Sequence, residues 1–180
     1  SRNTFTDEFN SWAVIRSFLT ESNNAQLIRH HIESYNDFMN KKIPTIVKQF
    51  NPLSIYHDYD TKNNNYHHEI RIEFGNVYYS KPLIHENDGS TKVMYPQEAR
   101  LRNFSYSSPI SIDMNVKVIK SPQEEETVLL EKELKNINIG KIPIMINSDY
   151  CMLKNNTDKK ILDEECKYDL GGYFIINGNE

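Results

Sequence analysis

The strictest alternation of apolar and polar side chains in the chain runs through Ile110-Ser111-Ile112-Asp113-Met114-Asn115-Val116-Lys117-Val118, and this stretch decides the fold. Side chains two residues apart lie on the same face of a strand, so the stretch predicts a long strand with one apolar face. Residues 128–139 predict a strand that returns antiparallel to it. The polar residues 120–126 predict the loop that connects the two strands.

A second alternation lies upstream of this stretch. Residues 68–74 alternate apolar with charged side chains, which predicts a half-buried strand. Gly75-Asn76 is typical of a turn, so we expect the next strand to begin with residues 77–80. Residues 86–90 are rich in polar residues and glycine and predict a further loop.

The first fifty residues have helical spacing instead. Three apolar residues recur at i, i+3 and i+7 and predict a first helix that begins near residue 6: Trp12, Ile15 and Leu19. We predict a second helix over residues 24–39 and a short third helix over residues 43–50, which ends at Asn51-Pro52. Helices that precede strands indicate the α+β class, helical over 6–50 and mainly an antiparallel sheet over 53–180.

Composition excludes several classes of protein. The chain has 180 residues, of which 38% are hydrophobic and 26% charged, as in an ordinary globular domain. Its net charge of -4 argues against a surface that grips nucleic acid by bulk electrostatics. The sequence holds no apolar run of the roughly 20 residues that span a bilayer, so we expect no membrane partner. Cys151 and Cys166 are not spaced as a zinc site, and we predict reduced thiols in an intracellular protein.

Arg100 and Arg102 form the best candidate site for contacts with a partner. Aromatic residues flank them: Tyr95, Phe104 and Tyr106. Such a combination can contact phosphates and stack on bases, or it can contact another protein subunit. The alternative is a set of internal ion pairs, for example with Glu98 or Asp113, and the residues alone leave both interpretations open.

One cluster resembles a metal site and would support a metal-dependent phosphoesterase: His57, Asp58, Asp60, His67 and His68. The asparagine-rich residues 62–65 between its two halves indicate a mobile loop, however. His67 and His68 are neighbours on a predicted strand and would point to opposite faces. We therefore favour a solvated loop and predict no metal ligand here.

Two glycine-containing pairs lie near the end of the chain. Gly171-Gly172 could cradle a phosphate, but a helix start and a Lys-Ser/Thr pair do not follow it, so we favour a tight turn or bulge. Residues 173–176 predict an apolar strand. Asn177-Gly178 after it is typical of a type I′ hairpin turn.

Three blocks in order carry a resemblance to a known family. They are residues 95–108, with Pro96-Gln97-Glu98-Ala99-Arg100-Leu101-Arg102-Asn103; residues 139–146, with Gly140-Lys141-Ile142-Pro143-Ile144-Met145; and residues 165–178, with Asp169-Leu170-Gly171-Gly172-Tyr173-Phe174-Ile175-Ile176-Asn177-Gly178. The chain resembles the second-largest subunit of multisubunit DNA-directed RNA polymerases, in its eukaryotic RNA polymerase II form. Lys167 and Asn179 depart from the family pattern, which usually has proline and serine or threonine there.

The resemblance implies that residues 1–180 are the N-terminal part of the region called the protrusion, one wall above the DNA cleft. The lobe, hybrid-binding, wall and zinc regions of the family lie downstream and are absent from this sequence. The residues for nucleotide addition also lie downstream, so we predict no catalytic, cofactor or metal residue in this segment. Magnesium and zinc would belong to the full polymerase.

The full enzyme implied by the resemblance synthesises RNA from ribonucleoside triphosphates on a DNA template. This segment would form cleft wall and interaction surface, and its partners would be other polymerase subunits, the remainder of its own subunit, DNA and initiation factors. The location would be the nucleus in a cellular eukaryote, or the virion or host cytoplasm for a large DNA virus, towards which the frequent Asn, Ile and Lys incline us. We also expect a longer subunit to cover an apolar patch near Phe174 and Ile176. The alternatives are a free-standing binding module and the metal-dependent phosphoesterase.

Overall fold

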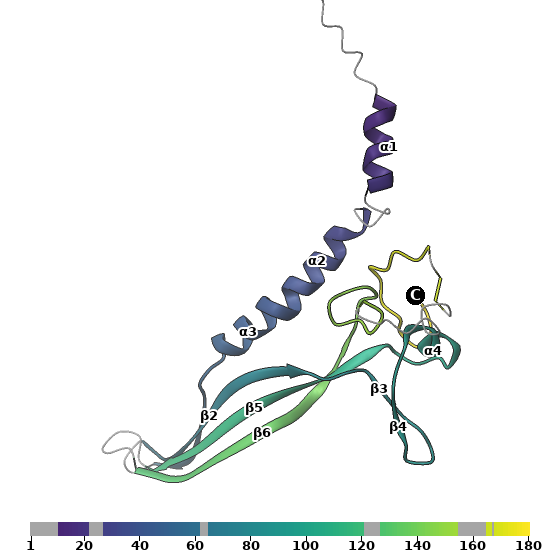
Figure 1. Ribbon diagram of the computed structural model, residues 1–180. Coiled ribbons are helices and arrows are strands. Elements are labelled where there is room, and N and C mark those ends of the chain that lie inside the picture. The colour runs from purple at the N-terminus through teal and green to yellow at the C-terminus, as the bar shows by residue number, and fades with distance from the viewer. Residues whose placement is uncertain (1–10, 22–26, 62–64, 121–126, 155–164, 167) are drawn as a thin grey trace, which may run out of the picture.

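The computed structural model describes residues 11–21, 27–61, 65–120, 127–154, 165–166 and 168–180 (Figure 1). In chain order its elements are α1 (Ser11–Glu21), α2 (Arg29–Asp37), the π-helix η2 (Phe38–Lys42), α3 (Ile43–Gln49), β1 (Leu53–Asp60), β2 (Asn65–Tyr79), β3 (Leu83–His85), β4 (Thr91–Val93), α4 (Pro96–Leu101), β5 (Ser107–Lys120) and β6 (Thr127–Pro143). Helices come first and strands dominate afterwards, which confirms the predicted α+β class.

The main sheet has four antiparallel strands in the order β1-β2-β5-β6 and forms a long, curved arm (Figure 1). Val116 of β5 lies between Ile72 of β2 and Lys132 of β6. The predicted strand over 110–118 and its antiparallel return are confirmed, and both run further than predicted. Of the predicted connecting loop, residues 121–126 lie outside the described part of the chain.

The predicted turn at Gly75-Asn76 is wrong, because β2 continues through it. The register with β5 shifts between Phe74 and Val77, which marks a β-bulge. A Cβ on Gly75 would lie 3.2 Å from the Cβ of Asp113, so glycine lets the two strands approach closely here. The Asn51 side chain donates to the carbonyl of Phe74 at 2.8 Å and accepts from its amide at 3.0 Å. It thereby extends the pairing of β2 beyond the first residue of β1.

The predicted break between the second and third helices is also wrong. α2, η2 and α3 form one continuous helix, in which the amide of Ile43 bonds to the carbonyl of Phe38, five residues back. Pro44 lies inside this continuous helix, just after the π-helix, and has no amide to donate there. The predicted end at Asn51-Pro52 is confirmed, with a cis peptide bond there. No helix within the described residues is long and apolar enough to cross a membrane.

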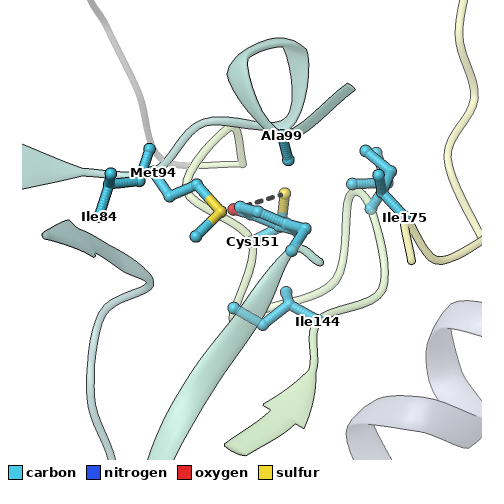
Figure 2. Close-up of a cluster of buried hydrophobic side chains, with 8 residues drawn as sticks. Ile84, Met94, Ala99, Ile144, Cys151 and Ile175 are labelled. Carbon is cyan, nitrogen blue, oxygen red and sulfur yellow. Dashed lines mark hydrogen bonds between the residues drawn. The ribbon is translucent and has the colours of Figure 1, made fainter. Parts of the chain in front are cut away.

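The main core lies beside the sheet, where the β3–β4 hairpin, α4 and the C-terminal segment meet. Figure 2 shows side chains from these separate elements converging on one another. The buried residues of this cluster are Ile84, Met94, Ala99, Tyr106, Ile144, Ile146, Cys151 and Ile175. The Tyr106 hydroxyl accepts a hydrogen bond from the amide of Met152 at 3.1 Å, so its one polar group is satisfied inside the core. Both cysteines are free; Cys151 is buried and Cys166 exposed.

A second cluster fixes the long helix to the base of the sheet. Tyr35 and Met39 on the helix and Met145 after β6 are buried together. The Tyr35 hydroxyl donates to the carbonyl of Pro143 at 2.7 Å, and the Tyr79 hydroxyl donates to the carbonyl of Met39 at 2.9 Å. Each bond joins helix to sheet, one in each direction. Burial raises the pKa of Tyr35 to about 12, so it remains a donor at neutral pH.

The prediction of a strand over 173–176 is wrong, because this segment belongs to neither of the two sheets. Its carbonyl at Ile175 accepts from the amide of Tyr106, and its carbonyl at Tyr173 accepts from the amide of Ile146, both at 2.9 Å. It therefore fills the space between two other segments. Ile175 is fully buried, whereas Ile176 is 42% exposed, so the expected apolar patch is limited to part of this segment.

The predicted turn at Asn177-Gly178 is confirmed. Asn177 and Gly178 have φ of 51° and 79°, and hydrogen bonds in both directions join Ile176 to Asn179, as in a type I′ turn. Gly171 and Gly172 have φ of 78° and 82°. Glycine adopts such left-handed backbone without strain.

We predict that Gly171→Ala destabilises the fold by about 3 kcal/mol, because it adds a steric clash to the cost of a left-handed alanine. A Cβ on Gly171 would lie 2.6 Å from the carbonyl oxygen of Ile146. The matched control is Gly89→Ala, since Gly89 also has a left-handed φ of 84° but no heavy atom lies within 4 Å of its Cβ position. This variant should cost about 1 kcal/mol. Urea unfolding measures both, and equal losses would contradict the steric argument.

Candidate functional site

The two candidate arginines lie at the end of α4. This short helix begins with Pro96 at its first position, after the extended Tyr95. Arg100 lies in its last turn, where a cation interacts favourably with the helix dipole, and Arg102 is its C-cap. Because the two are only two residues apart on a helical path, their side chains point to different neighbours.

Arg100 points towards the C-terminal segment, and its side chain is 19% exposed. Its Nη1 lies 2.9 Å from Glu165 Oε2, and its Nε lies 2.5 Å from Glu180 Oε1. Its Nη2 donates to the Tyr173 hydroxyl at 2.6 Å and lies 3.5 Å from Asp169 Oδ2. Its Nη1 also donates to Gln97 Oε1 at 3.3 Å. One planar guanidinium thus binds five side chains, a use for which lysine lacks the geometry.

Burial alone would lower the pKa of Arg100, but the hydrogen bonds to Glu165, Glu180 and Tyr173 outweigh it and raise the pKa. Burial and the hydrogen bond to Asp169 raise the pKa of Tyr173. Arg100 therefore stays charged and Tyr173 stays protonated, which is the pairing that the hydrogen bonds require.

Arg102 points towards the loop between β3 and β4. Its two terminal nitrogens lie 2.6 and 2.9 Å from the two carboxylate oxygens of Glu86, a bidentate pair. Nη1 also lies 3.1 Å from Glu98 Oε1, and the guanidinium carbon lies 4.8 Å from the centre of the Phe104 ring. Lys92 contacts the same two carboxylates, Glu86 at 3.1 Å and Glu98 at 2.7 Å.

The structure thus places both arginines in internal ion pairs. The suggested pair between Arg102 and Glu98 is present, whereas Arg100 pairs with neither Glu98 nor Asp113. Asp113 accepts instead from the Tyr78 hydroxyl at 2.8 Å. Sequence reasoning missed the partners of Arg100 because they lie 65 to 80 residues away along the chain. A contact of these arginines with nucleic acid or with another subunit stays a prediction.

A pocket of about 360 Å³ lies beside Arg100, lined also by its acidic partners and by Cys166. A nucleophilic role for Cys166 would need a base such as histidine close by. Among the residues that the structure describes, those that line this pocket include no histidine: Gln97, Arg100, Glu165, Cys166, Asp169, Tyr173 and Glu180. The groups assembled here suit ion pairing rather than covalent chemistry.

The histidine and aspartate cluster lies on the β1–β2 hairpin, so the prediction of a loop is wrong for the residues on these strands. Asp58 lies 2.8 Å from His57 Nδ1 and 2.9 Å from His68 Nδ1, and these hydrogen bonds lower its pKa, that from His57 most. His67 contacts Asp60 instead, at 3.6 Å. Among the described residues, no group of three or more His, Cys, Asp or Glu is arranged to hold a metal ion.

We predict that the ion pairs of Glu86 stabilise the fold in a pH-dependent way. Hydrogen bonds from Arg102 and then from Lys92 lower the pKa of Glu86 from 4.5 to about 2. A carboxylate with a lowered folded-state pKa stabilises the fold above its unfolded pKa and loses that contribution as the pH falls through the folded pKa. Urea midpoints of the wild type and Glu86→Gln should therefore differ above pH 4.5 and converge near pH 2. A difference that is constant with pH would contradict this role.

Comparison with known proteins identifies the family. A sequence model described as "RNA polymerase beta subunit" matches residues 26–180. "DNA-directed RNA polymerase II subunit RPB2" of Schizosaccharomyces pombe is 41% identical over 180 aligned residues, which cover 94% of this chain and 15% of that protein. "DNA-directed RNA polymerase II subunit 2" of Arabidopsis thaliana is 37% identical over 177 residues, 94% of this chain and 14% of that protein.

An archaeal relative extends the comparison. "DNA-directed RNA polymerase subunit Rpo2N" of Methanothermobacter thermautotrophicus is 34% identical over 171 residues, 94% of this chain and 29% of that protein. The chain thus spans only about a seventh of the length of its two eukaryotic relatives. The match over residues 26–180 nevertheless covers most of the chain, and the chain therefore belongs to the RNA polymerase beta subunit family.

Proposed function

We propose that this chain is a structural segment of a DNA-directed RNA polymerase, the protrusion on one side of the DNA cleft. The observation that carries the proposal is the family match over residues 26–180 together with two arginines that are held in internal ion pairs. The enzyme would join ribonucleotides on a DNA template with magnesium bound outside this segment, and its zinc would also lie elsewhere. This segment itself would not catalyse the joining of ribonucleotides.

A scaffold must hold its parts in fixed positions, and the ion pairs suit this role. Arg102 and Lys92 tie α4 and the β3–β4 hairpin together through Glu86 and Glu98. Arg100 ties α4 to the C-terminal segment. The buried cluster beneath these contacts joins the same three segments. The body thus fixed presents the four-stranded arm for contact with other molecules.

The arm exposes apolar side chains that suit contacts with protein. Val128, Leu129 and Leu130 near the start of β6 are each half exposed. Leu53 and Ile55 on β1, the opposite edge strand, are similarly exposed. Exposed apolar groups that gather on strand edges mark interaction surfaces. We infer that other polymerase subunits and the rest of the same subunit cover them.

Contact with DNA is a finer part of the proposal and would not use Arg100 and Arg102 directly. Each would have to exchange carboxylate partners for phosphates, and the chain's net charge of -4 gives no general attraction. DNA would then lie along the wall without tight binding by these residues. Initiation factors are proposed as further partners of the same outer surface.

The location follows from the host. The eukaryotic relatives named above are subunits of RNA polymerase II, which supports a nuclear location for a cellular protein. A large DNA virus is the second candidate source, and it rests on the frequent Asn, Ile and Lys and on the departures from the family pattern at Lys167 and Asn179. In that case the protein would work in the virion or in the host cytoplasm.

A domain exchange tests the proposed function. Residues 27–180 would replace the aligned segment of the fission yeast subunit, and the chimeric polymerase would be purified through a tag on another subunit. We expect the chimera to assemble and to synthesise RNA on a DNA template. The control chimera carries Gly171→Ala and should assemble less well, since its fold is weakened. The proposal would be contradicted if residues 27–180 were folded but the chimeric polymerase did not assemble, and the Gly171→Ala chimera gave the same result.

We also predict that Arg100→Met destabilises the fold by about 2 kcal/mol, because it leaves half-buried carboxylates without their cation. The control is Lys48→Met, which removes an exposed charge on α3 and should change stability by less than about 0.5 kcal/mol. Thermal unfolding and duplex DNA binding would be measured on both. A variant that keeps full stability but binds DNA with a weaker salt dependence would assign Arg100 to phosphate contact instead.

A further inference from the structure

The β3–β4 hairpin has an edge that is paired on one side only. β3 and β4 form a two-stranded sheet of their own, apart from the four-stranded arm (Figure 1). The carbonyl of Pro82 accepts from the amide of Met94, and the amide of Glu86 donates to the carbonyl of Ser90, each at 2.9 Å. Antiparallel strands alternate hydrogen-bonded and non-bonded pairs. Ile84, the one even-numbered residue of β3, therefore directs its backbone groups towards β4, as Pro82 and Glu86 on either side of the strand do.

The odd-numbered residues, Leu83 and His85, direct their amide and carbonyl groups away from β4. Within the part of the chain that the structure describes, no backbone hydrogen bond joins these groups to another segment. Unpaired groups on a strand edge are a template for a further strand. Leu83 and His85 are two residues apart, and every second residue of a strand points its backbone groups to the same edge. An added strand could therefore pair with both residues.

A groove of about 330 Å³ runs along this free edge. All three residues of β3 line it, together with Met94 after β4 and with Phe104, Ser105, Ser107 and Lys141. None of the three residues of β4 lines it. The groove therefore lies on the side of β3 to which the unpaired groups point.

Lys141 gives this groove a positive charge. Its side chain is exposed on β6, opposite Pro109 in the sheet register. No carboxylate among the described residues forms an ion pair with it, in contrast to nearby Arg102, which has two acidic partners. Leu83 and Phe104 supply half-buried apolar surface in the same groove.

We propose that this groove binds an extended segment of another polypeptide, which adds a strand to β3 and places an acidic side chain beside Lys141. Backbone hydrogen bonds to Leu83 and His85 would supply affinity, as in other cases of strand addition. The acidic side chain and its apolar neighbours would supply selectivity. The surface follows from the backbone geometry of β3, so the inference does not depend on the proposed role in a polymerase.

A defined peptide tests the proposal on the purified chain. The probe is a fluorescein-labelled, capped Thr-Val-Asp-Val-Glu-Thr, and the control is an otherwise identical peptide that is N-methylated at every internal residue, so that neither of its edges can donate to a strand. We expect saturable binding of the first peptide in fluorescence anisotropy and at least about tenfold weaker binding of the second. Hydrogen exchange at the amides of residues 83 and 85 should slow when the first peptide binds. Equal binding of the two peptides, or no binding of either, would overturn the proposal.

Two matched variants locate the contact. His85→Pro removes only an amide that points away from β4, whereas His85→Ala keeps that amide and loses the same side chain. The proline variant should bind about tenfold more weakly than the alanine variant. Lys141→Glu should weaken binding about threefold and favour a peptide with lysines in place of its acidic residues. Equal affinities of the two residue 85 variants would place the peptide elsewhere, and circular dichroism would establish that both are folded.

Discussion

The guanidinium of Arg100 joins parts of the chain that lie 65 and 80 residues apart in sequence. It is held at the end of α4 and reaches three acidic residues and a tyrosine of the C-terminal segment. Because the site is partly closed to water, each of these hydrogen bonds is stronger than it would be on an open surface. The segment that Arg100 fixes in turn supplies Ile175 to the main core. The position of the C-terminal segment therefore depends on one charged side chain as well as on apolar burial.

The rest of the molecule extends from this fixed body in two directions. The four-stranded arm carries exposed apolar residues on both edge strands, and the β3–β4 hairpin carries an unpaired edge beside Lys141. The body is held together by ion pairs, and its strands carry exposed apolar side chains and unpaired backbone groups. These features suit a component that other chains cover. This arrangement agrees with the family to which the chain belongs, because the relatives named above are subunits of RNA polymerases.

Features with a local signal were predictable from the sequence. The alternation over residues 110–118 defined β5, and the Asn177-Gly178 pair defined its turn, because both depend on neighbouring residues alone. The bulge in β2 was not predictable, since Gly75-Asn76 has the composition of a turn and the difference lies in Asn51 and Asp113, which are distant in sequence. α4 is too short for a periodic pattern. The pairing of Arg102 with Glu98 was suggested by spacing, while the partners of Arg100 required the folded chain.

We propose that Arg100 and Arg102 hold this segment together within a polymerase and do not grip DNA. The most direct test of this proposal is a cryo-electron microscopy map of the native assembly, purified through this chain and bound to a DNA template. We expect polymerase subunits around the arm and Arg100 still bonded to Glu165 and Tyr173. A map in which Arg100 contacts a DNA phosphate and its carboxylate partners have moved away would contradict it.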